Sequence, residues 1–154
     1  DDIPWLREIP TCKVKGYDGY LYECTWLNPK DAAARGIVSG DIIKVYNDRG
    51  ITLGGTYVTE RVSAGTVHMD HGSRIDRIAD RIDRGGANNL ISPYECTGNI
   101  SWGQATSGYL CEVEKLEPNE MEVWKKTYPE AFARKYDPAY GLHTDAWIDD
   151  GGEE

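Results

Sequence analysis

The chain has 154 residues, which suits a single domain with enough length for one packed core. Its 17 basic and 26 acidic residues give a formal net charge of −9, which excludes a broad basic face for nucleic acid. Hydrophobic residues make up 40% of the chain, too many for a disordered protein, and no apolar run is long enough to span a bilayer. The composition therefore predicts a soluble globular protein with no nucleic-acid or membrane partner.

The four cysteines, Cys12, Cys24, Cys96 and Cys111, are too far apart in sequence for a paired-cysteine metal or redox motif. Two disulfides are arithmetically possible, but a chain with a sizeable core favours reduced, partly buried thiols. Residues 1–20 show no export signal. We therefore expect a reducing, cytoplasmic compartment.

The first half of the chain predicts short β-strands. Residues 1–19 contain prolines and glycines without a sustained period, so we expect an extended lead-in that is neither strand nor helix. Residues 20–27 are aromatic and β-favouring, which predicts a strand. Asn28 then provides an N-cap and Pro29 a first helical position for a helix of one or two turns, which ends before Gly36.

The strands that follow predict a small closed barrel. Residues 42–46 and 51–60 form a predicted hairpin around a tight turn, with a bend at Gly54-Gly55. Another strand is expected at 66–70, and a last strand at 109–116 would close the barrel by pairing with an early segment. The long excursion between these two strands, residues 71–108, is a candidate functional loop.

Helical signals appear only near the C-terminus. Acidic residues early and basic residues late predict a helix over 119–136, divided in two by Pro129. The acidic residues 145–154 predict a solvated or partner-bound tail. The expected organisation is therefore a lead-in (1–19), a barrel (20–116) and a helical extension with an acidic tail (117–154).

Three motifs carry a family resemblance: LNPKDAAARGIVSGDIIKVYNDRG at 27–50, VTERV at 58–62 and GGANNLISP at 85–93. Together they resemble the C-terminal, molybdopterin-dinucleotide-binding domain of the dimethyl sulfoxide reductase family. The first motif alone would fit any double-psi β-barrel, so it indicates a fold better than a function. The stretch at 89–92 is more specific, because the family has Asn-x-Leu-Thr beside the pterin dinucleotide. The resemblance implies a mainly β fold, a double-psi β-barrel with short helices and a C-terminal helical extension.

Finer similarity points to one branch of that family. The segments WLREIP at 5–10, RGG at 84–86 and CEVEK at 111–115 are most similar to the large subunits of pyrogallol–phloroglucinol transhydroxylases. This implies hydroxyl transfer between polyhydroxybenzenes, molybdopterin guanine dinucleotide as cofactor, and an iron–sulfur small subunit as partner. It also implies that the molybdenum ligand and the catalytic residues lie in other domains of the large subunit.

The candidate cofactor-binding residues are amides and hydroxyls, which suit base edges and a polar pterin. The resemblance nominates Asn89 first, together with its neighbour Asn88, and Ser92 in place of the family's threonine. The small-residue stretch 97–108 adds three further candidates: Asn99, Gln104 and Ser107. Each also has a structural interpretation, because asparagine and serine cap turns and such a stretch can form a surface loop.

Charged residues and histidines outside this set admit two interpretations. The arginines of the segment 74–84 are spaced 3, 4 and 3 apart, so one could neutralise a pyrophosphate, or the interleaved aspartates could pair with them on an exposed helix or loop. His68 and His71 point to opposite faces of an extended chain, which disfavours a metal site. Asp31 and Asp41 suit capping and turn roles.

An alternative function is a free-standing double-psi barrel without molybdenum. It would act as a protein-binding module through the acidic tail and the aromatic lead-in. A self-cleaving decarboxylase resembling aspartate decarboxylase is also open, with Gly72-Ser73 as the cleavage site.

Overall fold

A computed structural model describes residues 9, 12–96, 98, 100, 103, 108–137 and 142–144. The strands and helices are, in chain order, β1 (Lys13–Lys15), β2 (Leu21–Leu27), α2 (Pro29–Ala34), β3 (Ile42–Tyr46), β4 (Ile51–Val58), β5 (Val67–Met69), β6 (Arg77–Ala79), β7 (Ile82–Asp83), the 3-10 helix η2 (Asn88–Leu90), β8 (Glu112–Lys115), α3 (Pro118–Thr127), α4 (Pro129–Ala133), β9 (Lys135–Asp137) and β10 (Leu142–Thr144). The fold is mainly β with short helices, as the sequence predicts. No helix in these ranges is long and apolar enough to cross a membrane.

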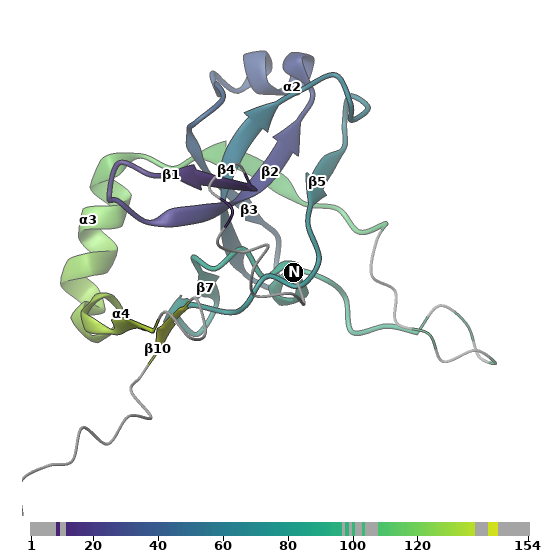
Figure 1. The fold of residues 1–154 in the computed structure, drawn as a ribbon. Helices are drawn as coiled ribbons and strands as arrows, with labels where there is room; N and C mark the ends of the chain where they lie inside the picture. The colour runs from purple at the N-terminus through teal and green to yellow at the C-terminus, as the bar shows by residue number, and fades with distance from the viewer. Residues whose placement is uncertain are drawn as a thin grey trace, which may run out of the picture.

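The main sheet has eight strands of mixed direction (Figure 1). Hydrogen-bonded neighbours follow the order β1-β2-β4-β3-β8. In addition, β5 pairs with β2, β7 pairs with β4, and β6 pairs with β7. β2 and β4 are parallel, whereas β3 is antiparallel to both β4 and β8. The expected last strand therefore exists, and it pairs with β3. Among the described strands no pairing joins β8 to β1, so the sheet is not closed.

Two segments expected to lack regular structure contain strands. The lead-in contributes β1, which pairs with β2 from Lys13 opposite Glu23 to Lys15 opposite Leu21. The excursion at 71–108 contains β6, β7 and η2. These short strands have no periodic signal of their own. β1 and β7 form along the longer strands β2 and β4, and β6 pairs with β7.

The helix α2 begins and ends as predicted. Asn28 Oδ1 accepts a hydrogen bond from the amide of Lys30 at 3.0 Å, and Pro29 occupies the first turn. The Asn28 amide also donates to the carbonyl of Val62 at 2.8 Å. The same side chain therefore caps the helix and fastens the loop before β5 to it.

The bend expected at Gly54-Gly55 is wrong, because β4 runs unbroken through both glycines. A Cβ atom at Gly54 would overlap the side chain of Thr25, and one at Gly55 would overlap Val14. The glycines are therefore places where neighbouring strands approach closely rather than a change of direction.

Buried side chains form two clusters on opposite faces of the sheet. One contains Leu27, Ala32, Ile37, Ile43, Val45, Ile91 and Val113. The other contains Tyr22, Ile42, Leu53, Ile78, Leu116 and Met121. Ile42 and Ile43 are adjacent on β3 and only 3% and 0% exposed, so β3 is covered on both faces.

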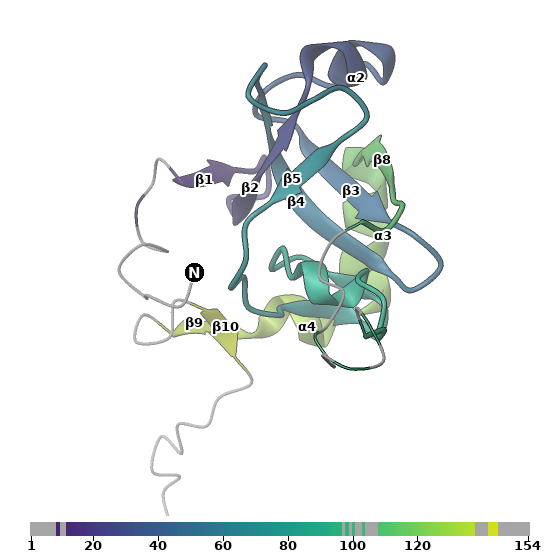
Figure 2. The same ribbon diagram turned by 90° about the vertical axis from the view of Figure 1, so that its right-hand side faces the viewer.

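The helices α3 and α4 confirm the division at Pro129. Glu117 caps α3 and forms a capping box with Glu120. Lys44 of β3 pairs with Glu120 at 2.7 Å, which holds α3 beside the sheet (Figure 2). The expected extension of the second helix to residue 136 is wrong: the chain leaves the helix after Ala133, and β9 pairs with β10.

Candidate functional site

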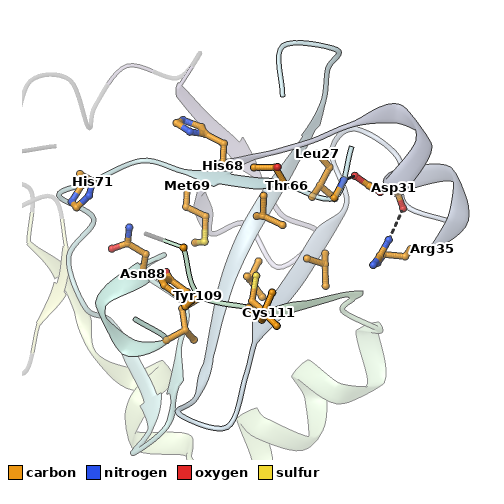
Figure 3. A pocket seen from close by; sticks show the side chains of 17 residues that line it. Leu27, Asp31, Arg35, Thr66, His68, Met69, His71, Asn88, Tyr109 and Cys111 are labelled. Carbon is orange, nitrogen blue, oxygen red and sulfur yellow. Dashed lines mark hydrogen bonds between the residues drawn. The ribbon is translucent and has the colours of Figure 1, made fainter. Parts of the chain in front are cut away.

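A cavity of about 590 Å³ opens at one face of the sheet (Figure 3). Its floor is apolar, with Leu27, Val45, Ile91 and Val113 among its residues. Polar side chains line the rim, at one end Asp31 and Arg35 and at the other His71 and Asn88. An apolar floor with a few polar groups at the edge is typical of a site for a small ligand or cofactor.

The first of these rim ends is part of the α2 region. The Asp31 carboxylate accepts a hydrogen bond from the amide of Gly65 at 2.7 Å, so its main role is to hold the loop before β5. Arg35 donates to the Asp31 carbonyl at 3.2 Å and is exposed. Asp41 likewise accepts from the amide of Val38 at 2.9 Å. The turn role predicted for Asp41 is confirmed. Asp31 lies in the first turn of α2 as expected, but its carboxylate bonds to a distant loop and does not cap the helix.

The opposite rim end is presented by η2. Asn88 is half-buried and lines the cavity, where Figure 3 shows its amide near His71. Asn89 is exposed and is not among the lining residues; its carbonyl accepts from Ser92 Oγ at 3.3 Å. The amide of Ser92 donates to the Asn88 carbonyl at 3.0 Å. Of the three described candidates, Asn88 therefore faces the cavity, and Ser92 closes the turn behind it.

The other three candidates, Asn99, Gln104 and Ser107, lie outside the described residues.

A buried carboxylate fixes the turn that leads into Asn88. Asp83 is 0% exposed, and it accepts hydrogen bonds from the amides of Asp76 at 2.6 Å and Ala87 at 2.8 Å. Burial raises the pKa of the Asp83 carboxyl, and these backbone donors partly offset that shift. Gly86 follows three residues after Asp83 and has φ +83. A Cβ atom added at Gly86 would lie 2.7 Å from the Cβ atom of Glu23. This turn needs glycine for two independent reasons.

The arginine-rich segment 74–84 forms β6 and β7 and not a helix, and part of it is buried. Arg84 is 5% exposed, and its guanidinium lies between the rings of Tyr20 and Phe132, 4.7 and 5.0 Å from their centroids. Its Nε donates to Asp76 at 2.9 Å, and Arg134 pairs with the same carboxylate at 3.2 Å. Arg84 is thus paired inside the protein and does not line the cavity. Pairing with an aspartate is confirmed, but the exposed setting expected for it is wrong at Arg84.

The two histidines both line the cavity, although alternation along a strand predicts opposite faces. His71 follows the end of β5, so the alternation does not extend to it. His68 lies 3.1 Å from Asp70 and stacks at a tilt on Trp26, with ring centroids 4.9 Å apart. Within the described residues no three histidine, cysteine or acidic side chains gather as metal ligands do.

Sequence reasoning did not identify Asn47, which joins the two walls of the cavity. From the turn between β3 and β4, its amide donates to the carbonyl of Ile91 at 2.8 Å and to that of Leu110 at 3.3 Å. The turn itself was predicted, but the partners are 44 and 63 residues away. Nothing in the local sequence indicates such contacts.

Comparison with known proteins relates the chain to one family. A family model described as "Molydopterin dinucleotide binding domain" matches residues 14–100. The pyrogallol hydroxytransferase large subunit of Pelobacter acidigallici is 35% identical over 111 residues, which are 70% of this chain and 13% of that protein. The dimethyl sulfoxide/trimethylamine N-oxide reductase of Rhodobacter capsulatus is 35% identical over 105 residues, which are 66% of this chain and 13% of that protein. The chain thus spans a small part of the length of these relatives.

Proposed function

The chain belongs to the molybdopterin dinucleotide-binding domain family, and on that premise we propose that its cavity receives part of a molybdopterin guanine dinucleotide. The observation that carries the proposal is the position of Asn88 at the rim of a cavity with an apolar floor. The asparagine amide offers both a donor and an acceptor, which is what the edge of a guanine or a pterin requires.

The lining fits a flat, polar ring. Tyr109 and Met69 provide apolar surface against which a ring can lie, and Thr66 and His71 add polar groups at the edge. Gly65 and Gly108 line the cavity without side chains, so a ligand can approach the backbone there. The volume, about 590 Å³, lies within the range of about 300–1,000 Å³ that is usual for small-molecule sites.

The role of these residues is to bind and to orient. Asn88 would hydrogen-bond a ring edge, the floor would exclude water from the ring face, and Asn47 and Asp83 would hold the two walls at a constant separation. The bound cofactor supplies molybdenum for oxygen-atom or hydroxyl transfer. We assign no acid, base or nucleophile to this chain, since the proposed chemistry takes place in other domains.

For the whole protein, we propose a molybdenum enzyme of the transhydroxylase branch, which moves hydroxyl groups between polyhydroxybenzenes. The match to a pyrogallol hydroxytransferase large subunit supports this activity. A large subunit also suggests a smaller partner, and we propose that this partner is an iron–sulfur protein. We further propose that the enzyme is cytoplasmic. Reduction of sulfoxides or N-oxides is the alternative activity, supported by the similarity to the Rhodobacter reductase. Assays of the full-length enzyme with pyrogallol, dimethyl sulfoxide and trimethylamine N-oxide distinguish the two.

The double-psi barrel and the boundaries at 20–116 and 117–154 also remain proposals. The parallel pairing of β2 with β4, between which the chain passes through α2 and β3, supports the barrel type. An experimental structure of the complete enzyme tests it through the strand order and the closure of the sheet.

The cavity assignment is tested with Asn88→Ala and Asn89→Ala in the full-length enzyme. Molybdenum is measured by plasma mass spectrometry and guanine nucleotide by acid release, each per polypeptide. Losing one or two hydrogen bonds should lower retention of both by about three- to tenfold for Asn88→Ala, with little change for Asn89→Ala. The reverse result would assign the ligand role to Asn89, and a wild-type enzyme without molybdenum would reject the proposed function.

A further inference from the structure

Two cysteines that do not line the cavity lie at one end of the ladder between β1 and β2: Cys24 is within β2, and Cys12 directly precedes β1, in a 3-10 turn. In the ladder between β1 and β2, Lys13 is opposite Glu23, and Val14 is opposite Tyr22. Continuing this register by one residue puts Cys12 opposite Cys24. Opposed residues of antiparallel strands have Cα atoms about 4.5–5.5 Å apart. A disulfide requires about 4.4–6.8 Å, so the spacing suits a bond between these two cysteines.

The continued register also predicts that the two cysteine side chains share one face of the ladder. Directly opposite residues of an antiparallel pair share one face, and the ion pair between Lys13 and Glu23 shows that neighbouring cross-strand side chains meet in this ladder. The thiol of Cys24 is close enough to Cys12 and Asp70 for each to affect its ionisation, although burial is the main cause of its raised pKa. Both cysteines are free thiols.

Accessibility differs between the two thiols in a way that favours stepwise oxidation. Cys12 is exposed and open to a small reagent, whereas Cys24 is half-buried. Cys24 lies between the two strands that share one edge of β2, because β1 begins opposite Glu23 and β5 ends opposite Thr25. A bond at Cys24 would therefore fasten β1 next to β5, which lines the cavity.

We propose that Cys12 and Cys24 are a redox modification site that closes to a cross-strand disulfide with a small-molecule disulfide such as oxidised glutathione. The Cys12 thiol attacks one sulfur of glutathione disulfide, and one glutathione leaves with the proton from Cys12. The Cys24 thiol then attacks the Cys12 sulfur of the mixed disulfide, and the second glutathione leaves with the proton from Cys24. Two protein thiols are oxidised and one glutathione disulfide is reduced to two thiols.

The sequence allows this bond to be identified in the full-length protein. Trypsin releases Cys12 in the peptide Glu8–Lys13 and Cys24 in the peptide Gly16–Lys30. These two peptides stay together only through a disulfide between the two cysteines. The other cysteines, Cys96 and Cys111, fall together in the peptide 85–115 and provide an internal control.

The full-length protein is incubated with oxidised glutathione, once folded and once in guanidinium, then alkylated, digested and analysed by mass spectrometry. The folded protein should yield the linked peptide pair in about tenfold excess over any pairing with Cys96 or Cys111, because the fold raises the effective concentration of the two thiols. Guanidinium should abolish this preference, and Cys24→Ser should leave Cys12 as a mixed disulfide with glutathione.

Recovery of Cys12 and Cys24 from the folded protein as separate alkylated or glutathionylated peptides would overturn the proposal. So would equal yields of the linked pair with and without guanidinium. Neither result depends on molybdenum content, so the proposed function and this site can fail separately.

Discussion

Arg84 donates from Nε to the Asp76 carboxylate at 2.9 Å, with both side chains almost completely buried. The pair joins two parts of the chain, because Arg84 also donates to the carbonyl of Ala131 in α4 at 3.4 Å. Figure 1 shows α4 and β7 at the end of the molecule opposite α2. The helical extension is thus fastened to the segment that leads into the cavity turn.

Replacing Arg84 by alanine should destabilise the protein strongly. The change leaves the Asp76 carboxylate buried with less compensation, which costs about 3–5 kcal/mol when a buried pair loses one partner. Denaturant unfolding measures the loss. The control is Arg81→Ala, because Arg81 is exposed and its side chain makes a long, 3.4 Å hydrogen bond to the Asp48 carbonyl. Its effect should stay within about 0.5 kcal/mol, and equal losses for the two variants would contradict a buried role for Arg84.

Alanine at Gly86 should destabilise more than alanine at Gly65. Both glycines have positive φ, +83 and +79, so both variants incur backbone strain of about 1 kcal/mol. At Gly86 the new Cβ also meets the side chain of Glu23, whereas nothing lies within 4 Å at Gly65. Overpacking should add about 1–3 kcal/mol for Gly86→Ala. Unfolding measurements that gave the same value for both would show that the backbone yields freely at this turn.

Asn47→Ala should loosen the cavity wall, and this expectation rests on the proposed function. The variant removes hydrogen bonds to the carbonyls of Ile91 and Leu110, so hydrogen exchange at residues 88–92 should rise and molybdenum content should fall severalfold.

Asn28→Ala is the matched control for Asn47→Ala. Like Asn47, whose side-chain oxygen accepts from the Arg49 amide, Asn28 accepts from a backbone amide, that of Lys30, and donates to a backbone carbonyl, that of Val62. Each variant should cost about 1 kcal/mol of stability. The cofactor content of Asn28→Ala should equal that of the wild type. A comparable molybdenum loss in Asn28→Ala would mean that general destabilisation, not the wall, controls retention.

Glu114 should titrate below a typical glutamate because Tyr46 Oη donates to its carboxylate at 2.6 Å and Lys44 lies nearby. The pKa of Glu114 is lowered from 4.5 in the folded protein. Its stabilising contribution is therefore present above pH 4.5 and is lost as the pH falls through the folded-state pKa. Tyr46→Phe should raise the pKa of Glu114 in an NMR titration. Tyr57→Phe, on β4, should not, and an unchanged pKa in Tyr46→Phe would assign the whole effect to Lys44.

The local elements of the fold could be predicted because their signals lie within a few residues. The cap at Asn28, the proline at 129 and the apolar strands around residue 43 each specify structure through neighbours in sequence. β1 and β6 could not be predicted, since each has three residues and depends on pairing with another strand. The candidate site followed the same division: the sequence nominated both Asn88 and Asn89, but which of them lines the cavity depended on the direction of a 3-10 turn.

By itself, the sequence determined the β-rich composition of the chain, its capped helix, its hairpin and its membership of a cofactor-binding family, because periodicity, capping and motif residues act at short range. Only the tertiary structure decided which residues face the cavity and which charges are buried. Asp76, Arg84 and Arg134 look like solvated charges in sequence, and they meet because β6, β7 and α4 pack together. Burial is a property of that packing, and no local pattern encodes it.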